Sequence, residues 1–231
     1  MHTYKISYSH NDFIVNHLSD IDLMTKRHWS KSRFYELEVL KTIKDNIRNG
    51  GIIIDGGANF GNHSIWFVNF CEVTKIFCIE AVTDVFNVLK DNVKNNNTFN
   101  IICSFENVAL SDRDNQIATW GSIDYNNIGG TSMIIEDSVT NTDFVITKKL
   151  DSIVKPDEYD QITCIKLDIE GGEHRAIVGA EKVLTCSKPL LVCEAHTHKE
   201  FTNLDHLIKS ICPSYKYVLS LKSNTHFWMV K

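Results

Sequence analysis

The stretch GIIIDGGANFG, residues 51–61, decides the fold of this chain. Its first five residues predict a strand that is buried on both faces, because residues 52–54 form an uninterrupted run of isoleucine. The glycines that follow let the backbone turn sharply and approach a ligand closely. Gly61 lets the next helix pack near the strand. The stretch therefore predicts a strand, a ligand-binding loop and a helix in succession.

Short apolar runs alternate with amphipathic segments along the rest of the chain, which predicts a doubly wound, mostly parallel sheet with helices on both faces. Further strands are expected at 75–80, within 100–110, at 162–168 and at 189–195. The segments YKYVLS and THFWMV, residues 215–220 and 225–230, predict a final antiparallel hairpin. Ligands bind such sheets beyond the carboxyl ends of the strands, where the strand order reverses.

The length of 231 residues suits a single domain, 1–231, because no Pro/Gly/Ser-rich linker divides the chain. Apolar residues at helical spacing over 33–49 predict that residues 1–49 form an N-terminal helical extension. Residues 113–148 are polar with weak strand character, and we expect them to be an insertion over the active site.

Composition narrows the class of protein. The net charge of −5 argues against a general nucleic-acid binder, which usually carries a basic excess. We expect no membrane span, since no apolar run has the required length, and no signal peptide is visible, so a cytoplasmic location is expected. The cysteines lack C-x-x-C spacing, are odd in number and lie mostly in apolar runs, as is typical of buried thiols in a reducing compartment. They are Cys71, Cys78, Cys103, Cys164, Cys186, Cys193 and Cys212.

Two acids follow the first two expected strands. A carboxylate at Asp55 would repel a pyrophosphate but attract an α-amino group. Glu80 stands 24 residues beyond Gly56, where a carboxylate accepts hydrogen bonds from ribose hydroxyls. Ala58 breaks the glycine pattern of dinucleotide folds, which counts against an NAD-dependent oxidoreductase. S-adenosylmethionine, which has an α-amino group and no phosphate, suits the loop better, although both acids also read as ordinary strand-end residues.

Several pieces, in their order and spacing, resemble the FkbM family of S-adenosylmethionine-dependent methyltransferases. They are FYELEVL, IIIDGGANFGNHSI, CIEA, NVALSD, NIGGTSM, KKLDSI, IKLDIEGGEHRAIVGAEKVL and LLVCEAH. The resemblance covers most of the chain from Phe34 to Glu194. It implies a Rossmann-like class I methyltransferase fold with a seven-stranded sheet, S-adenosylmethionine as methyl donor and, usually, an oxygen acceptor. Asn59 stands where many methyltransferases have glycine, a change that the family tolerates.

The resemblance also implies a set of cofactor-binding residues. Residues near the methionine end of the cofactor are expected at Asp55, Gly56, Gly57, Asn59 and Gly61. Glu80 is expected at the ribose. Asn107, just past the third strand, would lie near the adenine, whose edge a side-chain amide recognises. Asn107 suits a turn-stabilising role equally well.

Candidate acceptor-site residues cluster after the fourth strand. Period-2 alternation puts Lys166 and Asp168 on one face, where an ion pair is the simplest account of a lysine in a central strand. Glu170 follows at a Gly-flanked turn, and we expect Asp168 or Glu170 to position or deprotonate the acceptor. Glu173 is expected to complement the dipole of the next helix.

Two histidines are alternative candidates for the base, and binding a metal ion is an alternative role for the carboxylates. His196, after the fifth strand, is the second candidate base, and His63 could also face the cleft, although a lone histidine is more often a polar surface residue. Carboxylates at Asp168, Glu170 and Glu194 could hold Mg²⁺. We rank a metal below metal-free catalysis and predict no metal site.

The sequence thus predicts an S-adenosylmethionine-dependent methyltransferase that methylates a hydroxyl group on a sugar, a glycan precursor or a secondary metabolite. A non-catalytic or N-directed S-adenosylmethionine-binding protein is the alternative, and an NAD-dependent oxidoreductase is less favoured. A small-molecule or glycan acceptor is the expected partner, without nucleic acid, and an oligomer is allowed but not specified. Trp29 and Trp120 could stack on a sugar face, although burial in the core is the more common fate of tryptophan.

Overall fold

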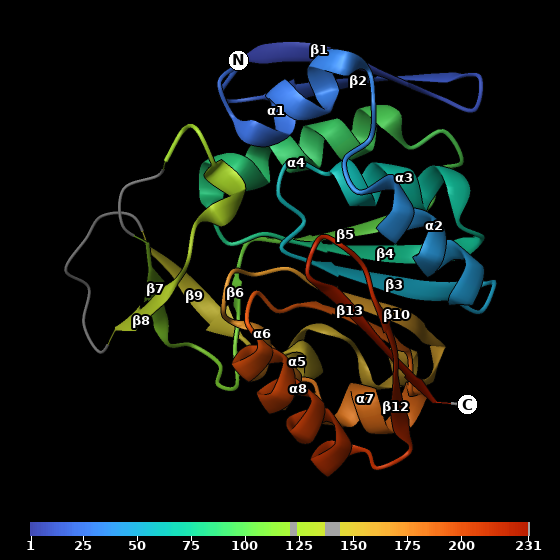
Figure 1. The fold of residues 1–231 in the computed structure, drawn as a ribbon, viewed down its shortest axis with the longest axis vertical. Helices are drawn as coiled ribbons and strands as arrows, with labels where there is room; N and C mark the ends of the chain where they lie inside the picture. The colour runs from blue at the N-terminus through green and yellow to red at the C-terminus, as the bar shows by residue number, and fades with distance from the viewer. Residues whose placement is uncertain (121–123, 137–143, 231) are drawn as a thin grey trace.

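A mixed sheet of seven strands forms the centre of the molecule (Figure 1). The structure is a computed structural model that describes residues 1–120, 124–136 and 144–230. The strands lie in the order β12-β13-β11-β10-β3-β4-β5. Their bounds are β3 Gly51–Gly56, β4 Val73–Ile79, β5 Ile102–Glu106, β10 Ile162–Leu167, β11 Leu190–Glu194, β12 Tyr215–Ser220 and β13 Thr225–Val230. The expected α/β fold with a seven-stranded sheet is confirmed.

Five neighbouring strands, β11, β10, β3, β4 and β5, run parallel to one another. β13 is antiparallel to both β11 and β12, so the last two strands form a hairpin at one edge. Every residue of β3 and β10 is buried, as central strands covered on both faces require. The chain first builds outward from β3 to β4 and β5 and then returns to β10, so the strand order reverses between β3 and β10.

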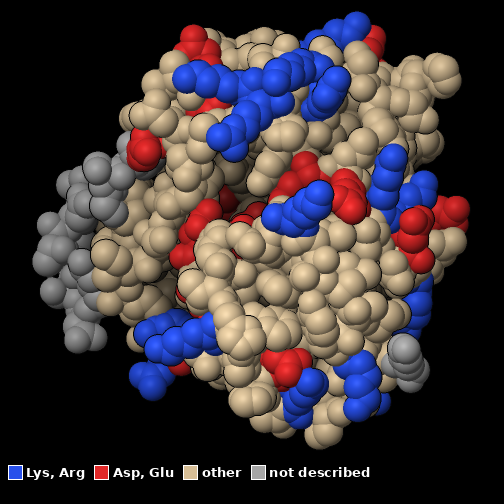
Figure 2. All heavy atoms as spheres, in the orientation of Figure 1, with Lys and Arg blue, Asp and Glu red and all other residues tan. Residues whose placement is uncertain are grey.

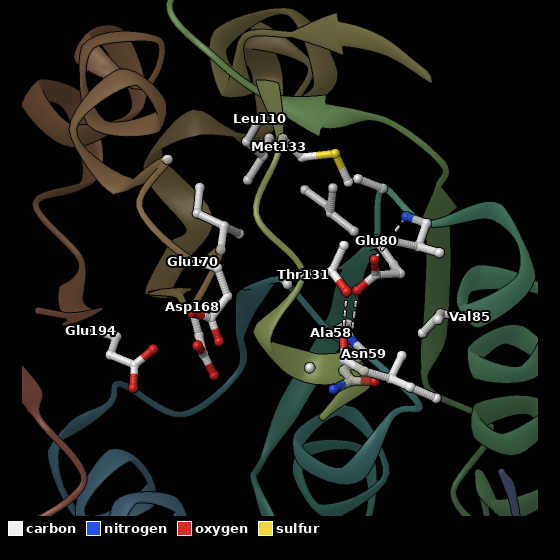
Figure 3. A pocket seen from close by; sticks show the side chains of 18 of the residues that line it. Ala58, Asn59, Glu80, Val85, Leu110, Thr131, Met133, Asp168, Glu170 and Glu194 are labelled. Atoms are coloured by element: carbon white, nitrogen blue, oxygen red, sulfur yellow. Dashed lines mark hydrogen bonds between the residues drawn. The ribbon is translucent and has the colours of Figure 1, made fainter. Parts of the chain in front are cut away.

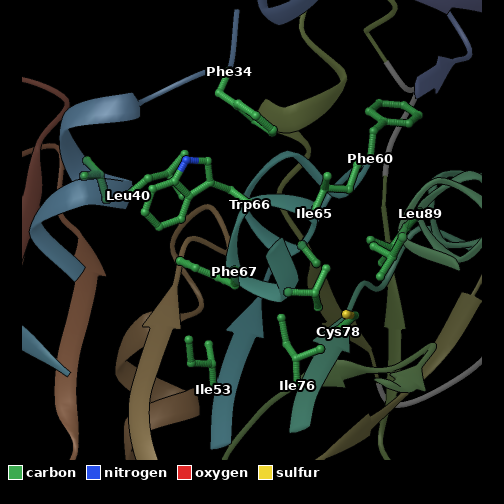
Figure 4. Close-up of a cluster of buried hydrophobic side chains, with 14 of the residues drawn as sticks. Phe34, Leu40, Ile53, Phe60, Ile65, Trp66, Phe67, Ile76, Cys78 and Leu89 are labelled. Carbon is green, nitrogen blue, oxygen red and sulfur yellow. The ribbon is translucent and has the colours of Figure 1, made fainter. Parts of the chain in front are cut away.

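Helices cover both faces of the sheet (Figure 1). One face carries α2 Leu37–Asn46, α3 Asn62–Phe70 and α4 Thr83–Asn96. The other carries α5 Leu150–Ile153, the 3₁₀ helix η3 Pro156–Gln161, α6 Glu173–Val178, α7 Glu181–Ser187 and α8 His198–Ile211. Strand alternation separates the two cores: Ile53 packs with Trp66 and Phe67 of α3 (Figure 4), while Ile52 and Ile54 face the opposite layer. Among the described residues, no helix combines the length and apolarity needed to cross a bilayer.

The N-terminal extension is only partly helical. Two strands, β1 His2–Tyr8 and β2 Asn11–His17, pair as an antiparallel hairpin. The short helices α1 Leu23–Arg27 and η1 Trp29–Lys31 follow before α2. The expectation of a helical extension is therefore wrong for residues 2–17, where Ile6, Phe13 and Val15 alternate into the core as strand residues do.

Two asparagines of α4 hold the hairpin against the domain. Asn92 accepts a hydrogen bond from the Asn16 backbone N–H (2.7 Å) and donates one to the Asn16 carbonyl (2.8 Å). Asn96, one turn later, does the same for Ile14 at 3.0 and 2.7 Å. The two side-chain amides thus satisfy the outer backbone edge of β2, as a neighbouring strand would. Asn92 also donates to the Phe60 carbonyl (2.8 Å), which ties the hairpin to the loop after β3.

The expected insertion forms a small second sheet. Its strands lie in the order β6-β9-β7-β8 and are β6 Ala109–Leu110, β7 Ile117–Thr119, β8 Ile134–Glu136 and β9 Phe144–Lys148. The 3₁₀ helix η2 Ile128–Gly130 lies between β7 and β8. Residues 121–123 and 137–143 of the insertion lie outside the described residues.

Replacing Asn92 by alanine should lower the free energy of unfolding by about 2 kcal/mol, because three buried or partly buried backbone groups lose partners while the helix gains little from alanine. Urea unfolding measures the change. Asn95→Ala, on the exposed side of α4, is the matched control and should leave stability within about 0.7 kcal/mol. Equal stability of the two variants would contradict the role assigned to Asn92.

Candidate functional site

A cavity of about 380 Å³ lies at the carboxyl ends of β3, β4 and β10, beside the point of strand reversal. Its volume falls within the usual range of small-molecule sites. Figure 3 shows two groups of side chains around it. Glu80, Asn59 and Val85 lie at one end, and Asp168, Glu170 and Glu194 lie at the other. The two groups are called here the Glu80 end and the acidic end.

The loop after β3 is shaped by backbone contacts. The Ile79 carbonyl accepts hydrogen bonds from the N–H groups of both Gly57 (3.0 Å) and Ala58 (2.9 Å), which fixes the turn against β4. Gly57 has φ +71°, and a Cβ there would collide with the Asp168 carbonyl oxygen. This position therefore requires glycine, for its conformation and for its close contact with the segment after β10.

Glu80 braces that loop while lining the cavity. Its two carboxylate oxygens accept hydrogen bonds from the backbone N–H groups of Asn59 and Val82, each at 2.9 Å. Burial raises the pKa of Glu80, although these N–H groups oppose the shift. Each oxygen keeps further acceptor capacity, so the carboxylate has room for hydroxyl groups in the cavity.

Asp55 is buried and lies outside the described lining of the cavity. One of its carboxylate oxygens accepts a hydrogen bond from Ser64 Oγ (2.6 Å), and the other lies 3.3 Å from Lys166 Nζ. Lys166 Nζ is also 3.3 Å from an Asp168 oxygen, so the expected pairing of Lys166 with Asp168 is confirmed. Burial lowers the pKa of Lys166, but the charges of Asp168 and Asp55 outweigh burial and raise it.

Carboxyl groups crowd the acidic end. Burial raises the pKa of Asp168, yet the charge of Lys166 and a hydrogen bond with Glu194 reverse that effect, and the net shift is downward. Burial and the neighbouring Asp168 charge raise the pKa of Glu194 to about 10. At neutral pH, Glu194 is therefore the protonated partner that donates to ionised Asp168. Burial and the charge of Asp168 also raise the pKa of Glu170.

His196 lies outside the described lining of this cavity and its side chain is about half exposed (49%). Its Nε2 atom lies 3.4 Å from a Glu194 oxygen and 3.5 Å from a Glu170 oxygen. One ligand atom from each of the three residues lies within 4.8 Å of the others, a spacing that a cation could share. The imidazole itself, placed between two carboxyl groups, accounts for the same arrangement.

Like Asp55, three more of the expected cofactor residues shape the site without lining it. Gly56 is the last residue of β3, and Gly61 caps α3 with φ +91°. Asn107 donates hydrogen bonds to the carbonyls of Glu80 and Ala81, both at 2.9 Å. The structure thus shows Asn107 in the turn-stabilising role that the sequence left open.

The insertion and the N-terminal arm supply walls that the sequence pattern did not specify. Thr131 and Met133 of the insertion pass across the cavity (Figure 3). Asp22 accepts a hydrogen bond from the Ile128 N–H (3.0 Å), which fastens this segment to the arm. Trp29 and Trp120 are buried in the core and do not offer a stacking surface.

Two residues of the cavity wall received no firm role from the sequence, and a third has a role beyond the expected one. Tyr35 and His63 line the cavity, and His63 Nε2 lies 3.3 Å from a Glu36 oxygen. Glu173 lies in the first turn of α6, as its expected helix-dipole role requires, and it also accepts hydrogen bonds from the Ile169 and Gly171 N–H groups (2.9 and 3.0 Å), which hold the loop after β10. Figure 2 shows acidic side chains gathered within the hollow on this face.

Known proteins resemble this chain in sequence and in fold. The sequence matches the model of the methyltransferase FkbM domain over residues 55–221. A search of curated proteins gives no match. The crystal structure of a methyltransferase FkbM from Methylobacillus flagellatus KT aligns with a TM-score of 0.59 and 18% identity over 78% of this chain and 43% of that one. A putative transferase from Pyrococcus horikoshii gives 0.52 and 9% over 98% and 70%.

At identities of 18% and 9%, the two structures show that these proteins have the same fold as this chain and nothing beyond the fold. The chain spans less than half the length of the M. flagellatus protein.

Replacing Lys166 by methionine should lower the free energy of unfolding by about 3 kcal/mol or more, because two neighbouring carboxylates lose a buried cation. Lys5→Met removes a half-exposed ion pair with Asp12 and should cost less than about 1 kcal/mol. Denaturant unfolding of both variants provides the comparison. A loss for Lys166→Met as small as that of the control would show that the buried pair contributes little.

Glu194→Gln should change how stability depends on pH. With a folded-state pKa of about 10, Glu194 keeps a proton that the unfolded chain releases as pH rises above the ordinary value of 4.5. This raised pKa therefore favours folding at low pH, and its contribution falls between those two values. Glutamine still donates to Asp168 and does not titrate, so the melting temperature of the variant relative to wild type should rise from about pH 5 to about pH 9.

Thermal unfolding at several pH values measures this difference. Glu181→Gln, at an exposed position of α7, controls for the loss of a glutamate. A difference between Glu194→Gln and wild type that is independent of pH would contradict the protonated state assigned to Glu194.

Proposed function

Because the chain belongs to the FkbM family of methyltransferases, whose domain model matches more than half of it, we propose that it transfers a methyl group from S-adenosylmethionine to a hydroxyl group. The acceptor is a sugar, a glycan precursor or a secondary metabolite. The observation that carries the proposal is the Glu80 carboxylate, which lines a cavity at the carboxyl end of β4 beside the strand reversal. A carboxylate at that place binds ribose hydroxyls in nucleoside-binding folds.

The lining of the cavity fits S-adenosylmethionine along its length. Glu80 keeps acceptor capacity for the ribose after binding two backbone N–H groups. The buried Oδ1 atom of Asn59 has no hydrogen-bond partner among the described residues, and an ammonium group in the cavity would satisfy it. Val82, Val85 and Val108 offer apolar surface for an adenine ring. Asp55 would act through Lys166, as its carboxylate is already held there.

S-adenosylmethionine, when bound, supplies a methyl group that its positively charged sulfur has already activated. The residues of the chain hold the acceptor oxygen in line with that group and exclude water. Asp168, kept ionised by Lys166, offers a fixed hydrogen-bond acceptor at the acidic end. Glu170 lines the same end, and we assign to these two carboxylates the binding of acceptor hydroxyls. His196 would support them by holding Glu170 and Glu194.

The charge of the acidic end supports a polyhydroxylated acceptor. Carboxylates accept hydrogen bonds from sugar hydroxyls and repel phosphates, so an uncharged sugar suits them. An amine suits them too, which keeps the N-directed alternative as an outcome of the test. The exclusion of nucleic acid and the state of assembly stay predictions.

Isothermal titration with S-adenosylhomocysteine, with NAD as the control ligand, tests the cofactor. Micromolar binding of S-adenosylhomocysteine and none of NAD is expected. Glu80→Gln should weaken that binding by at least about tenfold, because one charged acceptor is lost. Glu106→Gln changes the last residue of β5, which is the register partner of Ile79 and is not itself among the described lining residues, and should leave affinity within about twofold. Binding of NAD instead would overturn the proposal.

Formation of S-adenosylhomocysteine with a panel of sugars, nucleotide sugars and amino sugars then tests the acceptor. Turnover with hydroxyl compounds is expected, and turnover confined to amino sugars would favour the N-directed alternative. Binding without turnover on the whole panel would favour a non-catalytic protein. The panel is run with and without EDTA, since activity that survives EDTA excludes a metal held by Glu170, Glu194 and His196.

A further inference from the structure

A buried histidine–carboxylate pair stands beside the cavity and has no role in the site described so far. His63 is the second residue of α3 and lines the cavity. Its Nε2 atom lies 3.3 Å from an oxygen of Glu36, and the two side chains are 6% and 9% exposed. The Nε2 atom forms no hydrogen bond among the described residues, and the Glu36 carboxylate lies within ion-pair distance of it. A carboxylate at Nε2 favours a proton on that nitrogen and leaves Nδ1 as the acceptor.

The backbone is built to bring Glu36 to this place. Glu36 precedes α2 with φ 51° and ψ 42°, a left-handed conformation that is unfavourable for a residue with a Cβ, and its side chain does not cap the helix. Tyr35, the residue before Glu36, is held by the side chain of Asn62, which accepts a hydrogen bond from the Tyr35 N–H (2.9 Å) and donates one to the Tyr35 carbonyl (3.0 Å). Asn62 is in turn the neighbour of His63. The start of α2 is thereby locked to the start of α3, with the carboxylate directed to the imidazole.

The other bases at this end are less suitable. Asp168 is held as an anion by Lys166 and already accepts the proton of Glu194. Glu194 is protonated at neutral pH. His196 lies outside the described cavity lining and is occupied by two carboxyl groups. Glu170 lines the cavity but pairs with His196 in turn. His63 combines a place in the cavity wall with a carboxylate that orients it. Enzymes that use histidine as a general base often orient the imidazole with a carboxylate in this way.

Resting on the function proposed above, we propose that His63, oriented by Glu36, is the base that takes the proton of the acceptor hydroxyl. The acceptor O–H bond breaks as its oxygen forms a bond to the methyl carbon. The carbon–sulfur bond breaks with its electron pair left on sulfur, and the proton goes to Nδ1 of His63. The charged groups around the imidazole are Glu36 before α2, and Asp168 and Lys166 at the end of β10, with the phenol of Tyr35 beside them.

The first test measures turnover with the best acceptor of the panel. His63→Ala should lower kcat by about 100-fold or more, because general-base catalysis contributes at least that much. Its affinity for S-adenosylhomocysteine should stay within about twofold of wild type, which shows an intact fold and cofactor site. Added imidazole should restore part of kcat in His63→Ala. Glu36→Gln should lower kcat by less, without rescue by imidazole. His206→Ala, at an exposed position of α8, is the control.

The second test needs no acceptor. Nitrogen-15 NMR of labelled histidine should show His63 protonated at Nε2 and unprotonated at Nδ1 in the wild type, with that preference lost in Glu36→Gln. The opposite tautomer in the wild type would overturn the proposal.

The remaining outcomes separate the two proposals. Full kcat in His63→Ala, or a loss that imidazole does not reverse, would remove His63 as the base while leaving methyl transfer in place. Loss of turnover in His196→Ala with full turnover in His63→Ala would move the role to His196. Failure of the wild type to bind S-adenosylhomocysteine would overturn the proposed function itself. Binding without turnover on any hydroxyl compound would overturn the base assignment together with the acceptor class.

Discussion

The ammonium group of Lys166 lies between two carboxylates on adjacent strands, and the geometry of the site depends on it. Asp55 is the penultimate residue of β3 and Asp168 follows β10, so their negative charges would repel each other across the strand reversal without a cation between them. Removing three charges from water is costly unless each finds close partners. The pairing therefore fixes how the ends of β3 and β10 approach each other. The Gly57 contact with the Asp168 carbonyl is made at the same junction.

This arrangement changes the meaning of the acid before the glycine loop. From its position in the sequence, Asp55 was expected to face an amino group of the cofactor. In the structure its charge is matched from within the protein by Lys166 and Ser64. Asp55 therefore stabilises the structure beside the cavity and offers no free carboxylate to a ligand. Glu80, whose oxygens accept hydrogen bonds from backbone N–H groups of the loop after β3 and of its own loop, is the acid that retains capacity for a ligand.

The sequence predicted what depends on local periodicity. Buried runs gave β3 and β10, and period-2 alternation gave the Lys166–Asp168 pair. The N-terminal hairpin was missed because its turn lacks the usual signal. Ser9 and His10 both adopt positive φ, at 50° and 65°, where such two-residue turns generally have Asn-Gly. Without that signal, the alternation of residues 2–17 did not stand out.

Contacts between distant segments set the limit for the site. The sequence indicated Asp168, Glu170 and Glu194 because they lie at or just after the ends of neighbouring strands. Glu36 meets His63 only because α2 docks on α3 through the Asn62 side chain, a contact that no spacing in the sequence reveals. The protonated state of Glu194 likewise follows from the carboxyl group beside it in space.

The two asparagines of α4 that hold β2 bind only its backbone. Asn92 and Asn96 bind the N–H and carbonyl groups of residues 16 and 14, and the Ile14 side chain is 52% exposed. The outward-facing side chains of this hairpin, and the surface that they form, can therefore change in evolution without weakening the attachment of the hairpin to α4. Proline is the exception, because it has no N–H for the asparagines to bind.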